Sequence, residues 1–215
     1  MRSYLLLDDN LAFAENLAEI LRDGGDEATV VTEGPRALSL AGARRFDALL
    51  TDMQMPGMSG AVAVRHIRQV DPGLAVVVIT AHPRLEDLEA VRQQGLLAVL
   101  PKPVPIFPLV ELLARARRDA LVALLEEEQL ARGESLVGQL RSRGFSCVTA
   151  RSASDAGRLA DLRPFAALAD PRRPEGAAGE VLRQLRALLP TLPVFSTPTD
   201  LPSFLDALER VHDSR

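Results

Sequence analysis

Short apolar runs alternate with amphipathic stretches along the first half of the chain. Runs of strand length lie at residues 4–7, 29–32, 48–51, 75–80 and 97–100. Between them, apolar residues recur at the spacing of a helix over residues 11–21, 35–43, 60–70, 85–94 and 107–118. Parallel strands need crossover helices of this length, so the alternation predicts an α/β fold with a doubly wound parallel sheet.

The second half repeats the pattern of the first. The segment LLDDNLAFAENLAEIL, from Leu6, aligns with LEEEQLARGESLVGQL, from Leu125, with acidic residues matched at two adjoining positions. Further on, FDALLTDMQMP has a counterpart in FAALADPRRP, where Asp170 stands opposite Asp52 once one residue is dropped. This self-similarity indicates an internal duplication, with one α/β unit at residues 1–118 and a second at residues 119–215.

The second copy is shorter than the first. After a strand-like run at residues 192–195 the chain soon enters a final helix at 203–211, without room for a fourth helix and a fifth strand. We therefore expect a truncated α/β domain whose edge near Val194 and Phe195 packs on the first half or on a second subunit. Residues 109–132 contain neither Gly nor Pro, which favours one continuous helix between the halves.

Charge and composition narrow the class of protein. The net charge is −4 and the acidic excess is shared evenly, so neither half has the basic surface typical of nucleic-acid binders. The apolar runs are far shorter than the roughly 20 residues of a membrane span. Cys147 is the only cysteine, which excludes an internal disulfide. We expect a cytoplasmic protein without nucleic-acid or membrane partners.

Polar residues stand at the carboxyl ends of four predicted strands. Asp8 and Asp9 follow the first, Asp52 follows the third, Thr80 ends the fourth and Lys102 follows the fifth. Because the carboxyl ends of parallel strands meet at one crevice, we expect these side chains to lie together. Three adjacent carboxylates repel one another unless a cation binds, and Mg²⁺ prefers such oxygen ligands.

The same residues predict a magnesium site and a phosphoryl-transfer site. Asp9 and Asp52 are expected as direct ligands, Asp8 as a ligand through water, and the backbone carbonyl of Gln54 as a further oxygen. Lys102 and Thr80 then offer an ammonium and a hydroxyl to a phosphoryl group on Asp52. Lys102 is the only lysine among 25 Lys and Arg residues, which indicates that this position needs a compact ammonium rather than a guanidinium.

These residues stand in motifs that extend along the whole first half. The acid pair Asp8–Asp9, Asp52 in DMQMPGMSG, Thr80 in VITA and Lys102 in a Lys-Pro pair resemble the receiver domain of two-component response regulators. The resemblance covers residues 1–118 and implies the flavodoxin-like strand order 2-1-3-4-5. It also implies that Asp52 accepts a phosphoryl group from a histidine kinase or a histidine phosphotransfer protein.

The resemblance further implies how such a protein works. It would be a signalling switch rather than an enzyme, with output by contact with an unidentified downstream protein, and a homodimer is left open. The face expected to dock the kinase is made of Leu11, Ala14, Glu15 and the loop at Pro103–Val104.

Two departures from the family pattern bear on function. The family usually has Tyr or Phe three residues before the lysine, whereas this chain has Val99, so the usual aromatic switch is absent. In the second half the acid pair becomes Glu127–Glu128 and there is no lysine. We therefore interpret Asp170 as structural and the second half as a degenerate receiver, or pseudo-receiver.

Three other functions are retained as alternatives. In the first alternative the protein is a transcriptional regulator whose second half is a divergent DNA-binding domain. The lack of a helix-turn-helix pattern and of a basic surface disfavours it. In the second the protein is a phosphatase with an aspartate nucleophile, although such enzymes need a second acid where Gln54 stands. In the third it is a scaffold that never takes a phosphoryl group, which the exchange at Val99 supports.

Overall fold

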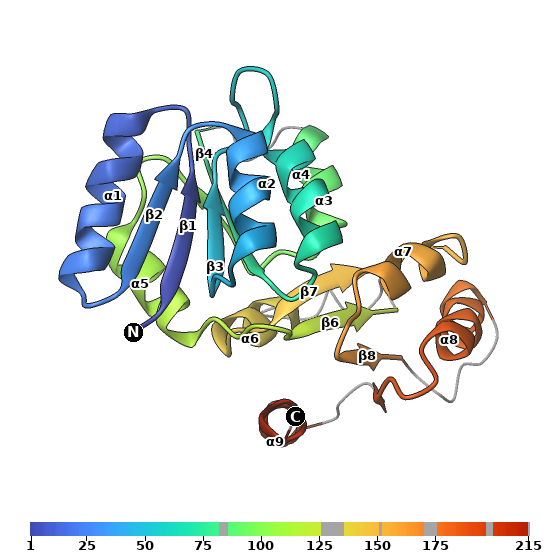
Figure 1. Cartoon of the computed structure of the whole chain (residues 1–215). Coiled ribbons are helices and arrows are strands. Elements are labelled where there is room, and N and C mark those ends of the chain that lie inside the picture. The colour runs from blue at the N-terminus through green and yellow to red at the C-terminus, as the bar shows by residue number, and fades with distance from the viewer. Residues whose placement is uncertain (82–85, 126–135, 151, 170–175, 197–199, 215) are drawn as a thin grey trace.

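The computed structural model describes residues 1–81, 86–125, 136–150, 152–169, 176–196 and 200–214, and the side chains of residues 86–88 are outside this description. Within those ranges the chain forms two parallel sheets (Figure 1). The first has the strand order β2-β1-β3-β4-β5, and the second has the order β7-β6-β8-β9. The predicted α/β fold and its 2-1-3-4-5 order are therefore confirmed.

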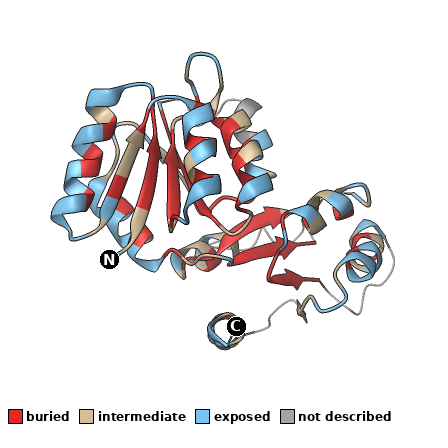
Figure 2. Ribbon diagram, in the orientation of Figure 1, coloured by how far each residue is buried: buried red, intermediate tan, exposed pale blue. Residues whose placement is uncertain are grey.

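The first sheet is covered by helices on both faces. Its strands are β1 (Ser3–Leu7), β2 (Glu27–Val31), β3 (Ala48–Thr51), β4 (Ala75–Thr80) and β5 (Ala98–Pro101). Its helices are α1 (Leu11–Asp23), α2 (Gly34–Ala43), α3 (Gly60–Val70), α4 (Glu86–Arg92) and α5 (Ile106–Arg115). Neighbouring side chains of a strand point to opposite faces, so Leu5 packs with α2, α3 and α4 while Leu6 packs with α1 and α5. The three central strands β1, β3 and β4 are accordingly buried along nearly their whole length, whereas the edge strands β2 and β5 are only partly buried (Figure 2).

The second sheet is smaller and follows the same plan. Its strands are β6 (Leu121–Leu124), β7 (Ser146–Thr149), β8 (Ala166–Leu168) and β9 (Val194–Phe195). Its helices are α6 (Leu136–Ser142), α7 (Asp155–Asp161), α8 (Ala177–Leu188) and α9 (Leu201–Asp213). Side chains of α6 and α9 form the core on one face, and those of α7 and α8 form the core on the other. None of the described helices is both long and apolar enough to cross a membrane.

The two halves are related element by element. The order β7-β6-β8-β9 corresponds to β2-β1-β3-β4 of the first sheet, and α9 covers its sheet beside α6 as α5 does beside α1. Gly25 and Gly144, which align in the duplicated segments, have φ angles of 89° and 84° just after α1 and α6. Among the described elements there is no counterpart of α4 and β5, so the predicted truncation is confirmed.

The connection between the halves is a turn, so the prediction of one continuous helix is wrong. The helix expected over residues 107–118 ends at Arg115, and Asp119 adopts a left-handed φ of 53° before β6 begins. Arg118 donates from Nη2 to both carboxylate oxygens of Asp71, at 2.7 and 2.8 Å. This ion pair stabilises the turn because it holds Arg118, which would otherwise continue α5, against the end of α3.

The second half lies beneath the amino ends of β4 and β5 (Figure 1). Cys147 of β7 donates its N–H to the carbonyl of Leu96 at 3.2 Å, in an isolated antiparallel bridge just before β5. Asp119 donates its N–H to the carbonyl of Gly73 at 2.9 Å, just before β4. The two sheets are therefore joined at the end of the first sheet that is opposite to its carboxyl edge.

The edge near Val194–Phe195 does not pack on the first half, so that alternative of the prediction is wrong, while packing of this edge on a second subunit stays a prediction. The strand that contacts the first half is β7, at the other edge of the second sheet. The ring of Phe195 packs instead against Phe204 of α9, with 5.8 Å between centroids. Helix α9 packs its buried side chains on the same face of the sheet, beside β9.

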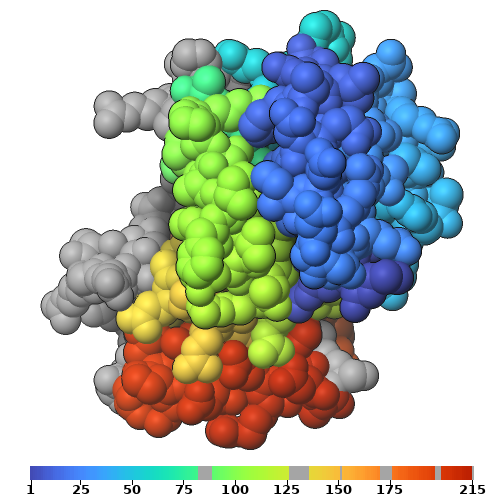
Figure 3. All heavy atoms as spheres, turned by 90° about the vertical axis from the view of Figure 1, so that its left-hand side faces the viewer, coloured from blue at the N-terminus to red at the C-terminus, as the bar shows by residue number. Residues whose placement is uncertain are grey.

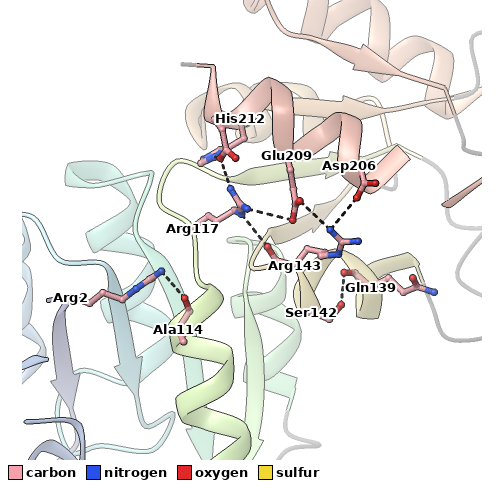
Figure 4. A network of polar contacts seen from close by, with 10 residues as sticks. Arg2, Ala114, Arg117, Gln139, Ser142, Arg143, Asp206, Glu209 and His212 are labelled. Atoms are coloured by element: carbon pink, nitrogen blue, oxygen red, sulfur yellow. Dashed lines mark hydrogen bonds and ion pairs between the residues drawn. The ribbon is translucent and has the colours of Figure 1, made fainter. Parts of the chain in front are cut away.

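Helix α9 is tied to the turn between the halves by a polar network (Figure 4). Arg117 and Arg143 both pair with Glu209, at 3.4 and 3.1 Å. His212 places its Nε2 2.9 Å from the carbonyl oxygen of Arg118. Because these groups are partly exposed, each pair contributes about 1 kcal/mol or less, and together they orient α9 more than they stabilise it.

We expect Gly144→Ala to destabilise the protein strongly. Besides its left-handed φ, Gly144 has no room for a side chain, since a Cβ would lie 1.8 Å from the carbonyl oxygen of Arg115. The free energy of unfolding, measured in urea, should fall by about 2–4 kcal/mol. The matched control is Gly157→Ala in α7, where a Cβ meets open space. That variant should gain up to about 1 kcal/mol, and equal stability of the two variants would contradict the expectation.

Candidate functional site

Two aspartates are brought together at the carboxyl edge of the first sheet. Asp8 follows β1 and donates its N–H to the carbonyl of Val31 at 3.2 Å, while Asp52 follows β3 and donates to the carbonyl of Leu7 at 2.9 Å. These bonds continue the sheet pattern by one residue beyond each strand. Because β1 and β3 are neighbours, the two carboxylates point into the same space.

Lys102 joins both carboxylates. Its Nζ lies 2.7 Å from Oδ2 of Asp8 and 2.7 Å from Oδ2 of Asp52. Its backbone N–H donates to the carbonyl of Thr80 at 2.9 Å, which ties the end of β5 to the end of β4. The lysine side chain is only 21% exposed, so water screens these ion pairs weakly.

The electrostatics of the ammonium follow from this enclosure. Burial lowers the pKa of Lys102, but hydrogen bonds to Asp52 and Asp8 and their negative charges raise it by more, so the pKa is raised above its ordinary value. Lys102 therefore carries its charge throughout the physiological pH range.

The acidic cluster has the form of a cation site. Asp8, Asp9 and Asp52 each offer a carboxylate oxygen, and these oxygens all lie within 4.8 Å of one another. Asp8 is buried, Asp9 is exposed and Asp52 is intermediate, so one side of the cluster opens to solvent. Carboxylates at such an opening suit Mg²⁺, which binds a few protein oxygens and keeps several waters.

The loop after Asp52 shapes the carboxylate. Its Oδ1 accepts the N–H of Met53 at 2.6 Å and approaches the N–H of Gln54 at 3.4 Å. The start of α3 presses on the same loop, since a Cβ at Gly60 would lie 1.9 Å from the carbonyl oxygen of Asp52. Gln54 is thus beside the carboxylate, while the role of its carbonyl as a ligand stays a prediction.

The remaining predicted residues lie around this centre. Thr80 ends β4, is 1% exposed and pairs in register with Pro101 of β5. Val99 pairs with Val78 and packs, half-buried, on the core of the face that carries α3 and α4. The counterparts in the second half, Glu127–Glu128 and Asp170, lie outside the described residues.

One residue of the site was missed by the sequence analysis. The ring of Phe13, in the first turn of α1, lies under Lys102, with 4.5 Å between Nζ and the ring centroid. In the sequence Phe13 is one more apolar position of an amphipathic helix. The available signal was its place three residues after the helix-capping Asn10, which puts it next to the acid pair.

We expect Lys102→Met to lower stability in metal-free buffer by about 1–3 kcal/mol at neutral pH, because two carboxylates lose their shared donor. A raised pKa in the folded state means that this contribution is full below the ordinary lysine pKa and is lost as pH rises through the folded value. The difference in free energy of unfolding between wild type and variant should thus stay constant up to about pH 10 and shrink above it.

Urea unfolding at pH 7 to 11 checks this, and Arg45→Met is the control. Arg45 pairs with Asp119, but both side chains are largely exposed, at 73% and 61%. Its loss should cost under about 1 kcal/mol at every pH. A difference for Lys102→Met that grows in alkali would have the wrong sign.

Comparison with known proteins agrees with this geometry. Residues 4–114 match the family model of the response regulator receiver domain. A response regulator receiver protein of Anaeromyxobacter sp. (strain Fw109-5) is 50% identical over 232 aligned positions, which cover 100% of this chain and 97% of that protein. The DNA-binding transcriptional regulator NtrC of Escherichia coli (strain K12) is 32% identical over 62% of this chain, which spans only 27% of NtrC.

A solved structure gives the same picture for the first half. The chemotaxis protein CheY4 of Vibrio cholerae aligns with a TM-score of 0.50 and 26% identity, covering 54% of this chain and 98% of CheY4. The family model and the full-length relative, with the sheet order and the carboxylate–lysine cluster, lead to one conclusion: this chain belongs to the response regulator receiver family.

Proposed function

We propose that the chain is a two-component response regulator whose phosphoacceptor is Asp52, with Lys102, Thr80 and Mg²⁺ as its chemical partners. The observation that carries the proposal is the contact of Lys102 Nζ with Oδ2 of Asp52 at 2.7 Å, inside a cluster of three carboxylates. An ammonium in this position stabilises negative charge on a phosphoryl group as it reaches Asp52.

The proposed reaction is phosphoryl transfer to a carboxylate. An Asp52 oxygen attacks the phosphorus of a phosphohistidine, a P–O bond forms, and the P–N bond breaks with its electron pair leaving on the imidazole. Lys102 then turns its ammonium to a phosphoryl oxygen, and the Thr80 hydroxyl donates to another. The protein is the acceptor of this group, so we assign it a switching role rather than an enzymatic one.

The residues that would hold Mg²⁺ are Asp8, Asp9, Asp52 and the carbonyl of Gln54. Bound Mg²⁺ supplies positive charge that offsets the carboxylates and the phosphoryl oxygens. Both oxygens of Asp8 already accept hydrogen bonds, from the Asn10 N–H at 2.9 Å and from Lys102 at 2.7 Å. Both oxygens of Asp52 accept hydrogen bonds as well, from the Met53 N–H and from Lys102, so these contacts do not distinguish the two acids. We assign Asp9 and Asp52 as the direct carboxylate ligands and Asp8 as a ligand through water.

An exposed apolar patch beside the site supports docking of a histidine kinase or phosphotransfer protein. Helices α1 and α5 lie side by side on one face, with α9 beneath them (Figure 3). Phe107 on α5 is 76% exposed, and Leu11 on α1 is also exposed. Ala14, however, is buried at 1% exposure, so the predicted docking face is corrected: Leu11 and Glu15 are accessible and Ala14 is not.

The proposed output passes from the first half into the second, the degenerate receiver. Arg158 of α7 donates from Nη1 to the carbonyl of Gln93, just after α4, and from Nη2 to the carbonyl of Thr149 at 3.2 Å. The bridge between Leu96 and Cys147 lies close by. A shift of α4 and the start of β5 on phosphorylation therefore reaches β7 directly, and the second half presents it to a downstream protein.

A DNA-binding output is the second candidate, favoured by the similarity to NtrC. Against it, the described part of the second half is a parallel sheet with helices on both faces. Residues 119–215 also carry 12 basic and 14 acidic side chains, which disfavours binding to phosphates. A gel shift with genomic fragments, with and without acetyl phosphate, separates the two: retarded DNA would favour the regulator of transcription.

Incubation with acetyl phosphate and Mg²⁺ should add one phosphoryl group to the wild-type chain, detected by intact mass. Asp52→Ala should add none, because the nucleophile is gone, and Asp170→Ala should add one as the wild type does. A chelator should abolish the addition. An unmodified wild type would instead support the scaffold alternative, and a steady release of phosphate from phosphomonoesters would support the phosphatase.

We expect Arg158→Ala to uncouple the halves without preventing phosphorylation of Asp52. With beryllofluoride as the phosphoryl mimic, hydrogen exchange should change at the α4–β5 turn and at β7 in the wild type, but only at the turn in the variant. Arg183→Ala is the control, since Arg183 lies exposed on α8 and, among the described residues, pairs with Glu180 of its own helix. An unaltered response at β7 in Arg158→Ala would remove this contact from the output route.

A further inference from the structure

The ammonium of Lys102 has a third neighbour besides its two carboxylates. Asp8 and Asp52 each accept one hydrogen bond from Nζ at 2.7 Å. The ring of Phe13 lies 4.5 Å from Nζ to its centroid, within the range of a cation–π contact. The group is therefore bounded by negative charge on two sides and by a π face on another.

Phe13 is itself held in place by the start of α1. The side chain of Asn10 accepts the N–H of Phe13 at 3.1 Å, and the N–H of Asn10 donates to Oδ1 of Asp8 at 2.9 Å. The ring, half-buried, lines a small pocket together with Asp8 and Asp52. One short segment thus fixes an acid of the cluster and the ring under the lysine.

We propose that Phe13 is a positioning residue for the phosphorylation of Asp52, holding the Lys102 ammonium between the carboxylates through its ring face. The inference rests on the proposed function, because the step it serves is transfer to Asp52. A lysine stem has four flexible bonds, and this side chain retains an outlet to solvent at 21% exposure. The ring of Phe13 attracts the ammonium and so opposes its movement into solvent.

The chemistry favours a ring over another hydrogen-bond acceptor. During transfer the ammonium turns from Asp52 to a phosphoryl oxygen, and a third acceptor would compete for the same protons. A π face attracts the cation without a fixed direction, so it keeps the charge in the pocket while the donors are redirected. A carboxylate there would also cancel the positive charge that the phosphoryl group requires.

Variants of α1 distinguish the effect of the π face of Phe13 from the effect of apolar packing. Phe13→Leu keeps an apolar side chain but removes the π face, whereas Phe13→Tyr keeps the face. Leu17 lies one turn further along α1, is buried and lines the same pocket, but has no ring to offer Lys102. Leu17→Ala is therefore the packing control, because it weakens the same core while keeping the Phe13 ring.

The position of the ammonium can be read directly, because Lys102 is the only lysine in the chain. With ¹³C-labelled lysine, the full-length protein gives one set of εCH₂ signals in a metal-free NMR sample. Ring current should shift these signals upfield in the wild type, in Phe13→Tyr and in Leu17→Ala. In Phe13→Leu they should return toward the position of an unfolded control.

The functional arm measures the rate of phosphorylation by acetyl phosphate and Mg²⁺. The rate should fall about three- to tenfold in Phe13→Leu, as expected for loss of one cation–π contact, and stay near the wild-type rate in Phe13→Tyr. An εCH₂ signal without an upfield shift in the wild type would overturn the role of Phe13, even where Asp52 is phosphorylated. So would a loss of rate that Phe13→Tyr fails to restore.

The NMR shift and the phosphorylation rate together distinguish a failure of the role of Phe13 from a failure of the proposed function. A wild-type chain that shows the upfield shift but takes no phosphoryl group would overturn the proposed function, and with it any role of Phe13 in transfer. A normal rate in Phe13→Leu, with the shift lost, would show that the contact exists and does not serve the reaction.

Discussion

The rest of the site depends on one ammonium group held between two carboxylates. Three aspartates at one edge of a sheet would repel one another, and Lys102, at 2.7 Å from two of them, offsets that repulsion in the folded protein. The same charge is what an incoming phosphoryl group needs. A cation that stabilises the resting fold and would also serve the proposed transfer accounts for a single lysine at this position among so many arginines.

The two ends of the first sheet carry different features of the molecule. Its carboxyl edge carries the acids and Lys102, while its amino edge carries the second half, through Gly73 and Leu96. The two ends are linked by α4 and β5, since β5 ends beside Lys102 and begins beside the bridge to β7. A change at Asp52 therefore has a short path to the second half, along one strand and the helix before it.

The second half preserves the architecture of the first while its chemistry has diverged. The order of its four strands and the left-handed Gly144 match their counterparts, because packing and turn geometry constrain them. Its sequence has no lysine to balance an acid pair. Its described residues instead make contacts: β7 and α7 contact the first half, and α9 pairs with the turn that joins the two halves. This arrangement favours a role in receiving the signal over a role in chemistry.

The sequence alone determined the fold class, the duplication and the strand ends at which the polar residues stand, while the strand order came from the resemblance to receiver domains. The first three follow from local patterns: β3 and β4 were predicted to the residue, and Asp8, Asp52, Thr80 and Lys102 stand at strand ends that topology must bring together. Only the tertiary structure decided that the linker turns at Asp119, that β7 is the edge which meets the first half, and that Phe13 lies under Lys102. Each of these depends on contacts between residues far apart in the chain, such as Arg118 with Asp71, and periodicity along a sequence carries no record of which distant partner a side chain will find.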